Sequence, residues 1–231
     1  MAKQRNKTYP TYEEYWRAVE EASFKKNCPS LNNGNHKTGR ACLTLSMPYR
    51  LSCRPDAPCL GLCYCRKGPQ AFPSVCGAYL RNFRLWQEDP AKFETQVDAA
   101  LTYNALPLLR FFDAGDVPDK EFAEMMFRLA EKHPEIKMMA FTKKYELFNE
   151  VLDEKELPEN LCIRFSMWDK HWNVPNPHNL PVSFVDFADS SNNPDIPKNA
   201  FTCRGGEDGV TCSNCQMCFN KKVKAVRLIE H

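Results

Sequence analysis

The second half of the chain alternates between short apolar runs and amphipathic segments, and this alternation restricts the folds open to it. Apolar runs cover residues 106–112, 136–141, 161–168 and 181–188, and helical periodicity covers residues 118–133 and 143–154. Continuous apolar strands that alternate with amphipathic helices are typical of a parallel sheet covered by helices. Because crossovers between parallel strands are right-handed, these units predict an α/β fold with a partial (β/α) barrel.

The first half of the chain adds helices and one further strand. Helical patterns cover residues 8–26, 78–86 and 90–103, the last with Asp89 as its N-cap, and residues 42–51 read as a strand. With 231 residues, 43% of them hydrophobic, the chain can bury a full core. We expect an N-terminal helical segment over residues 1–32, the partial barrel over 33–200 and a cysteine-rich segment over 201–231.

Most of the twelve cysteines fall into two dense groups, and this grouping indicates metal binding. The first group lies in the loop 53–76, where CLGLCYC has C-x3-C-x-C spacing; its members are Cys53, Cys59, Cys63, Cys65 and Cys76. The second group has two C-x2-C steps; its members are Cys203, Cys212, Cys215 and Cys218. The sequence has no apolar run of signal-peptide or transmembrane length, so we expect a cytoplasmic protein without a membrane partner. In that reducing compartment, clustered cysteines are metal ligands more often than disulfides.

Polar residues follow the expected strands where each one ends. The strand at 42–51 leads into the first cysteine loop, and the later strands end at Asp113, Gly115 and Asp116, at Thr142 and Lys143, and at Ser166 and Asp169. In such folds the chemistry takes place at the carboxyl ends of the strands, so these residues predict one functional rim. Asp116 has a second interpretation, as the N-cap of the helix that follows it.

Three histidines are placed by the same pattern. His133 ends the helix predicted over residues 118–133, where an imidazole interacts favourably with the helix dipole. His171 and His178 follow the strand at 161–168, which predicts a place on the functional rim. Either is a candidate acid, base or substrate contact there.

The order of these motifs resembles a known architecture. A strand, a cysteine loop, a helix and later strands ending FDAGDVP and IRFSMWD resemble the radical S-adenosylmethionine (radical SAM) partial barrel. That family's loop reads C-x3-C-x2-C, so the present loop is one residue shorter before its third cysteine. More narrowly, GNHKTG, CLGLCY, the AGD strand end and the terminal C-x2-C-x2-CF segment resemble the phage gene-product-88 domain family, from about residue 33 onward.

The radical SAM resemblance implies a [4Fe-4S] cluster with S-adenosylmethionine as a second cofactor. Cys59 and Cys63 would be two of three thiolate ligands, and Cys65, Cys53 or Cys76 the third. Three thiolates would leave one iron open for the amino and carboxylate groups of S-adenosylmethionine.

The same resemblance implies roles for residues outside the cysteines. Tyr64 would lie near the adenine, and Ser166 would face the ribose. Gly115 and Asp116 would form the strand end that holds the cofactor, with Asp116 bound to its amino group.

The C-terminal cysteines offer four thiolates, enough for a closed metal site. Their C-x2-C-x2-C spacing is closer to ferredoxin-type spacing than to a zinc ribbon, which favours a second iron–sulfur cluster over zinc. We expect the basic residues that follow to form a solvated face; they are Lys221, Lys222, Lys224 and Arg227.

Three function classes follow from these patterns. The first is a radical-SAM-like iron–sulfur protein, phage-encoded and in the host cytoplasm, that uses an electron donor to act on an unknown substrate. The second is a non-catalytic scaffold that binds zinc or iron–sulfur clusters. The third is a nucleic-acid-binding module; the net charge of +2 gives it no support, and its basis is the basic residues around the first loop, Arg50, Arg54, Arg66, Lys67, Arg81 and Arg84.

Overall fold

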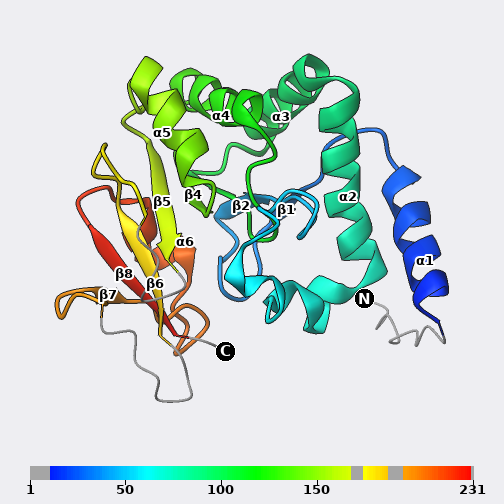
Figure 1. Cartoon of the computed structure of the whole chain (residues 1–231). Coiled ribbons are helices and arrows are strands. Elements are labelled where there is room, and N and C mark those ends of the chain that lie inside the picture. Colours follow the sequence, from blue (N-terminus) through cyan, green and yellow to red (C-terminus); the bar gives the residue numbers. More distant parts are fainter. Residues whose placement is uncertain (1–10, 168–173, 187–194, 230–231) are drawn as a thin grey trace.

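The computed structural model describes residues 11–167, 174–186 and 195–229. Its centre is one eight-stranded sheet with the order β1-β2-β3-β4-β5-β6-β8-β7 (Figure 1). The strands are β1 (Leu31–Asn33), β2 (Cys42–Leu45), β3 (Leu108–Phe111), β4 (Lys137–Thr142), β5 (Leu161–Met167), β6 (Val182–Asp186), β7 (Phe201–Thr202) and β8 (Ala225–Ile229).

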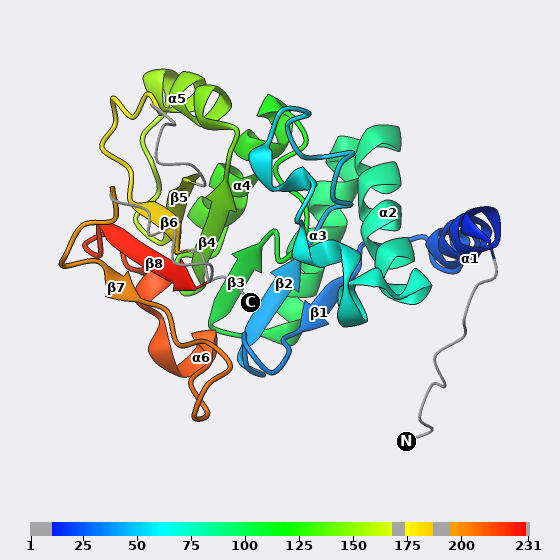
Figure 2. The same cartoon turned by 60° about the horizontal axis from the view of Figure 1, so that its bottom comes forward.

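The sheet is parallel except at one edge. β1 pairs antiparallel with β2, and every other pairing is parallel. From β2 to β6 the strands lie in the order in which they occur in the chain, as in a barrel that is wound in one direction. Figure 2 shows them as a curved row, from β1 at the right to β7 and β8 at the left. The parallel α/β sheet is therefore confirmed, and the sheet is open rather than closed.

The helices within residues 73–154 cover one face of this sheet (Figure 1). The α-helices are α1 (Tyr12–Phe24), α2 (Pro73–Glu88), α3 (Pro90–Asn104), α4 (Lys120–Lys132), α5 (Tyr145–Glu154) and α6 (Cys212–Cys215). Short 3-10 turns are η1 (Pro58–Leu60), η2 (Tyr64–Arg66), η3 (Gly68–Ala71) and η4 (Met217–Phe219). None of the helices in the described part of the chain has the length and apolar character needed to cross a membrane.

Aspartates begin two of these helices. Asp89 caps α3 by accepting a hydrogen bond from the Lys92 N–H at 2.9 Å, as predicted. Asp119 caps α4 in the same way, with the Phe122 N–H at 2.9 Å. The interpretation of Asp116 as this cap is therefore wrong, because Asp119 lies directly before the first helical residue.

Alternate strand residues face opposite sides of the sheet. Leu43, Leu109, Met138 and Ile163 belong to the main core, together with buried side chains of α2–α5. Their neighbours point to the other face, which we call the inner face; it carries Cys42, Leu108, Arg110, Met139, Cys162 and Arg164. The C-terminal cysteine segment packs against this inner face. Both faces are thus covered by the chain itself.

Candidate functional site

The carboxyl ends of β3, β4 and β5 are joined by hydrogen bonds. The Lys143 N–H donates to Asp116 Oδ2 at 2.8 Å, and Lys143 Nζ donates to Ser166 Oγ at 2.8 Å. Tyr145, the first residue of α5, donates from its hydroxyl to the Ser166 carbonyl at 2.5 Å. The prediction that these strand ends form one rim is therefore confirmed for Asp116, Lys143 and Ser166. Asp169 and His171 lie outside the described residues.

Asp116 is buried, with 6% of its surface exposed. Its Oδ1 accepts from the Val117 N–H at 2.8 Å, and its own N–H donates to Ser52 Oγ at 3.0 Å. Burial raises the pKa of this carboxyl, and the hydrogen bond from the Lys143 N–H opposes the shift. Asp116 thus ties the cysteine loop to β3 and β4, and its contact with a cofactor amino group stays a prediction.

Gly115 allows the rim to approach the cysteine loop closely. Its φ is +75°, and a Cβ at this position would lie 2.4 Å from the Met47 carbonyl oxygen and 2.5 Å from Ser52 Oγ. Only glycine fits this conformation and this contact without strain. Gly115 therefore permits a close approach between two backbone segments, and its part in cofactor binding stays a prediction.

Three thiols of the first loop gather beside this rim. Burial, and next the Asp116 carboxylate, raise the pKa of Cys53 to about 12. Burial also raises the pKa of Cys59, while the Lys143 ammonium lowers it. Negative charge on one of these thiols raises the pKa of its neighbours. This holds among Cys53, Cys59 and Cys63, so the three thiols share one electrostatic neighbourhood.

Cys63 and Cys65 form a hydrogen-bonded pair. This bond lowers the pKa of Cys63 to about 6, and Lys143 and Arg66 also favour its thiolate. The same bond and burial raise the pKa of Cys65, which is only 2% exposed and packs with Tyr79 and Ala114. Cys63 is therefore the thiol of this loop best suited to be a thiolate at neutral pH.

Cys76 lies in a different environment. Its thiol is 3.3 Å from the Tyr15 hydroxyl of α1 and donates to the Gln70 carbonyl at 3.2 Å. All twelve cysteines are free thiols. Within residues 11–167, 174–186 and 195–229, no three His, Cys, Asp or Glu side chains are positioned so that they could hold a metal ion together.

Tyr64 connects the first loop to β3. Its hydroxyl donates to the Asp113 carbonyl, while 53% of the residue is exposed. The Asp113 carboxylate accepts from Asn35 Nδ2 at 3.1 Å and from Gln70 Nε2 at 3.3 Å. It also pairs with the Arg110 guanidinium at 3.4 Å. An exposed aromatic ring beside the thiols is available for stacking with a planar ligand.

C-terminal cysteines lie on the inner face beside Cys42, a residue whose place there was not predicted from the sequence. Burial and negative charge on neighbouring thiols raise the pKa of Cys212 and Cys218, and Cys203 is among these neighbours. Cys212 in turn lies near Cys42, the first residue of β2. Burial, and next this neighbouring thiol, raise the pKa of Cys42 to about 12. No spacing signal relates Cys42 to the C-terminus, and only the fold brings them together.

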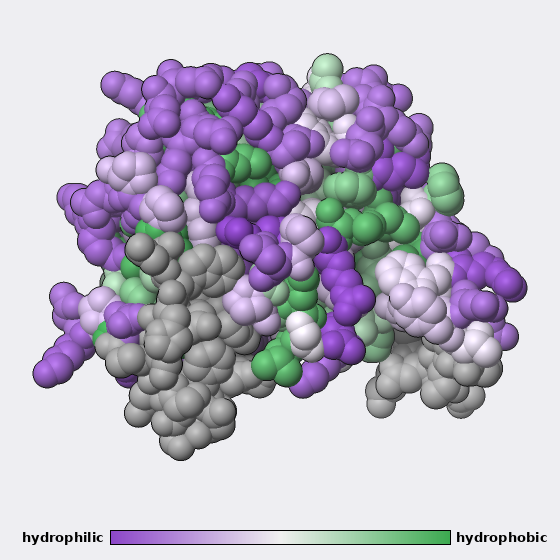
Figure 3. All heavy atoms as spheres, in the orientation of Figure 1, coloured by the Kyte–Doolittle hydropathy of each residue, from purple (hydrophilic) through white to green (hydrophobic). Residues whose placement is uncertain are grey.

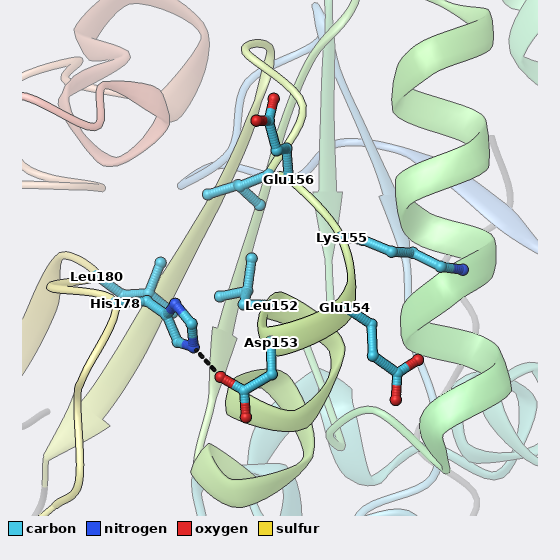
Figure 4. A pocket seen from close by; sticks show the side chains of 8 residues that line it. Leu152, Asp153, Glu154, Lys155, Glu156, His178 and Leu180 are labelled. Atoms are coloured by element: carbon cyan, nitrogen blue, oxygen red, sulfur yellow. Dashed lines mark hydrogen bonds and ion pairs between the residues drawn. The ribbon is translucent and has the colours of Figure 1, made fainter.

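Of the histidines discussed above, His133 lies where it was predicted and His178 does not. His133 caps the C-terminus of α4, as predicted, and its Nε2 lies 2.8 Å from Asp98 Oδ1. The rim position predicted for His178 is wrong, because its Nε2 lies 3.0 Å from Asp153 Oδ1 in the last turn of α5, whereas the rim lies at the first turn. Figure 4 shows this pair at an open pocket of about 450 Å³.

A second open pocket, of about 490 Å³, adjoins the rim. It is lined by Cys53, Arg54, Pro55, Asp56, Lys120, Lys144, Glu146, Leu147 and Glu150. Four large apolar side chains in the first loop or just before it are exposed, namely Leu51, Leu62, Tyr64 and Phe72. In Figure 3 the surface over α4 and α5 is mostly hydrophilic, whereas apolar side chains gather over α2.

Comparisons with known proteins identify a family. No curated protein and no solved structure matches the chain. The family model described as Gene product 88 matches residues 22–225. The match covers both cysteine groups and the whole rim. The chain therefore belongs to the gene product 88 family.

Proposed function

We propose that the protein is a phage-encoded iron–sulfur protein whose first cysteine loop binds a [4Fe-4S] cluster for radical-SAM-like chemistry. One observation carries the proposal: Cys53, Cys59 and Cys63 share one neighbourhood with Asp116 and Lys143 at the carboxyl rim of a parallel α/β sheet. Thiolates are the ligands that iron–sulfur clusters use. A site at the carboxyl ends of parallel strands agrees with where such folds carry their chemistry.

The donor set fits a cluster by its chemistry. Cys63 favours the thiolate, and the ammonium of Lys143 lies near enough to Cys59 and Cys63 to lower the cost of negative charge there. The side chains would have to rotate to surround one cluster. The third ligand would be Cys53, which has Cys59 and Cys63 as neighbours, or Cys65, which interacts directly with Cys63 but is buried against Tyr79 and Ala114.

The remaining rim residues would bind the second cofactor and the substrate. A bound cluster with one open iron would supply an electron to S-adenosylmethionine. Tyr64 offers an exposed ring for the adenine, and Ser166 offers a hydroxyl held by Lys143 Nζ for the ribose. The substrate, still unidentified, and an electron donor would reach the rim from its open side, where the second pocket lies.

A non-catalytic scaffold is the second candidate. It is favoured by Asp116, whose two carboxylate oxygens both already accept backbone N–H groups. The nucleic-acid alternative receives less support, because several of its basic residues already have partners. Arg54 pairs with Asp56, Arg84 pairs with Glu88, and Arg81 donates to α1 carbonyls.

Electron paramagnetic resonance of the reduced, reconstituted protein separates enzyme from scaffold. We expect S-adenosylmethionine to change the spectrum of the cluster and 5′-deoxyadenosine to be released. Ser166→Ala should weaken cofactor binding by roughly 0.5–1.5 kcal/mol, because one hydrogen bond is lost.

The matched control is Ser183→Ala on the neighbouring strand β6. Ser183 is buried beside Ser166, so this variant removes a hydroxyl from the same sheet without touching Lys143. A cluster spectrum that ignores S-adenosylmethionine would support the scaffold. Equal losses of affinity in both variants would remove the role given to Ser166.

A further inference from the structure

We propose that the exposed surface of the first cysteine loop binds single-stranded nucleic acid. The phosphates would pair with Arg50, Arg66 and Lys67, and the nucleobases would stack on exposed rings such as that of Phe72. This binding goes beyond the function proposed above and does not rest on it, because no cysteine and no metal takes part.

Charge is distributed unevenly along the chain. Residues 22–87 contain ten Lys and Arg side chains and one acid, Asp56, whereas the rest of the chain contains 21 basic and 28 acidic side chains. The segment therefore has a net charge of +9, and the rest of the chain has −7. It includes β1, β2, the first loop and most of α2, which lie on one side of the molecule in both cartoon views (Figures 1 and 2). A strongly basic region attracts polyanions even where the net charge of the whole chain is small.

Three cations of this segment lie in the first loop or just before it and keep their charge available. Among the described residues, Arg50, Arg66 and Lys67 are exposed, and none of them forms an ion pair with a carboxylate. Asp56, the acid of the segment, is already paired with Arg54 at 2.7 Å. Phosphate groups can therefore reach the three cations without displacing an acid.

Arg50 and Arg66 lie beside the same tyrosine. The Arg50 guanidinium is 6.0 Å from the centre of the Tyr49 ring. The Arg66 N–H donates to the Cys63 carbonyl at 3.1 Å, and Cys63 and Tyr49 pack against the same small buried cluster. Burial raises the pKa of Tyr49, and the guanidinium groups of Arg50 and Arg66 both oppose this shift. The two cations therefore border one surface, and Lys67 follows directly along the chain.

Exposed apolar side chains accompany these cations. They are Leu51, Leu62, Tyr64 and Phe72, which are 40–64% exposed. Unpaired nucleobases stack on aromatic rings and on guanidinium planes, whereas a duplex offers its phosphates but no free face of a base. The combination of cations and apolar side chains thus favours a single strand over a duplex. Tyr64 has a role in the function proposed above, so Phe72 is the ring that tests stacking by itself.

Hydrogen bonds hold this surface in place. The Tyr64 hydroxyl donates to the Asp113 carbonyl, and Gln70 Nε2 donates to the Asp113 carboxylate at 3.3 Å. Gln70 Oε1 accepts from the Tyr79 hydroxyl of α2 at 2.6 Å. Phe72 is fixed by the start of α2, because its carbonyl accepts two N–H groups of the first turn at 2.9 Å. A surface that is ordered before binding loses little conformational entropy when a ligand arrives.

Fluorescence anisotropy with labelled oligonucleotides tests the proposal on the unaltered chain. The probes are oligodeoxythymidine and oligouridine of about 16 nucleotides, which distinguish DNA from RNA as the ligand. We expect at least one of them to bind, and a duplex of the same length to bind more weakly. The logarithm of the affinity should fall by about 2 for each tenfold rise in salt, because each of three phosphate contacts to a single strand contributes about 0.7.

A charge-reversal variant tests the phosphate contacts. Arg66→Glu combined with Lys67→Glu should lower the affinity about tenfold or more and reduce the salt dependence. The matched control combines Lys92→Glu with Lys222→Glu, which changes the net charge equally at exposed lysines outside residues 22–87. Arg66→Lys combined with Lys67→Arg keeps both charges and should retain most of the affinity.

A second variant tests stacking without changing charge. Phe72→Ala should lower the affinity roughly fivefold or more, since one stacked nucleobase is lost, and should leave the salt dependence unchanged. Tyr103→Ala is its control, because Tyr103 is 89% exposed on α3 and lies outside the basic segment.

Circular dichroism of each variant checks the fold. Where Arg66→Glu disturbs the loop, Arg50→Gln combined with Lys67→Gln removes two of the three charges and should give a similar loss. Failure of both oligonucleotides to bind, a duplex that binds as tightly as the single strand, or equal losses in the control variants would each overturn the proposal. Polyglutamate that competes as well as the oligonucleotides would also overturn it and would indicate an acidic protein as the partner.

Discussion

Asp116 joins three structural elements through one carboxyl group and one N–H. It binds the backbone of Lys143 at the end of β4, the backbone of Val117, and Ser52 in the loop after β2. Because this group is buried, the charged carboxylate loses hydration that the hydrogen bonds only partly replace. Its pKa is raised in the folded state for this reason.

The raised pKa predicts a pH dependence of stability with a definite sign. A raised folded-state pKa means that protonation favours the folded state, so the contribution of Asp116 is full below the ordinary aspartate pKa and is lost as pH rises through the folded value. Relative to wild type, Asp116→Asn should therefore gain stability as pH rises from about 3.8 toward neutrality. Urea unfolding of both proteins across this range measures the difference.

The other carboxylates titrate in both proteins, so their effects cancel in that difference. Asp89→Asn, at an exposed helix cap, is the control. Above pH 6, where its effect on the cap is constant, its difference from wild type in unfolding free energy should not change with pH. A difference for Asp116→Asn that falls with rising pH would mean that the backbone N–H groups outweigh burial.

At the residue level, the sequence predicted polar residues at strand ends and helix caps. It did not predict which residues of a strand buried on both faces lie on the inner face. Asp116 and Lys143 follow apolar runs and Ser166 lies near the end of one, so their meeting at one rim was predictable. Cys42 gave no such signal, because all four residues of β2 are buried and alternation does not show which face each one takes. Its neighbour Cys212 is 170 residues away in sequence, and only the complete sheet relates the two.

Among the elements, the contact between α1 and α2 depends on a glycine inside a helix. A Cβ at Gly77 would lie 2.5 Å from the Ala22 Cβ and 2.8 Å from the Val19 carbonyl oxygen. Arg81, one turn further along α2, donates to the carbonyls of Ala22 and Ser23 at the end of α1. The two helices therefore approach closely at Gly77 and are held by Arg81.

Gly77→Ala tests this contact. Helix propensity alone favours alanine by about 1 kcal/mol, but the added methyl group must displace α1, at a cost of roughly 1–3 kcal/mol. We expect net destabilisation and faster proteolysis within α1. Gly61→Ala is the control, because Gly61 has an ordinary φ and open space around its Cβ position. A Gly77→Ala protein more stable than wild type would show that the helices can separate freely.

Element boundaries were less predictable than element types. The strand expected over residues 42–51 ends at Leu45, since the Met47 N–H bonds to the Ala114 carbonyl outside the ladder and Pro48 has no N–H to offer. α2 begins at Pro73, five residues before its predicted start, because proline suits a first helical turn and Gly77 is a packing residue. β8 was not predicted, since its lysine-rich approach reads as a solvated surface.

In the whole molecule, the two cysteine groups are connected through a partly buried ion pair between Asp113 and Arg110. Tyr64 in the first loop donates to the Asp113 carbonyl, and Asp113 pairs with Arg110, which lies beside Cys212 and Cys218. The curved sheet makes this possible, because β2 and β8 are separated by four strands yet the C-terminal segment reaches Cys42.

Iron and acid-labile sulfide in anaerobically prepared protein test the central claim most directly. We predict about four of each per chain, both lost when Cys59→Ser and Cys63→Ser are combined and both kept in Cys28→Ser, whose cysteine is exposed and apart from both groups. The variants should fold alike, because neither Cys59 nor Cys63 belongs to the main core between the sheet and the helices. Protein without sulfide after reconstitution, or iron and sulfide unchanged in the double variant, would contradict the account.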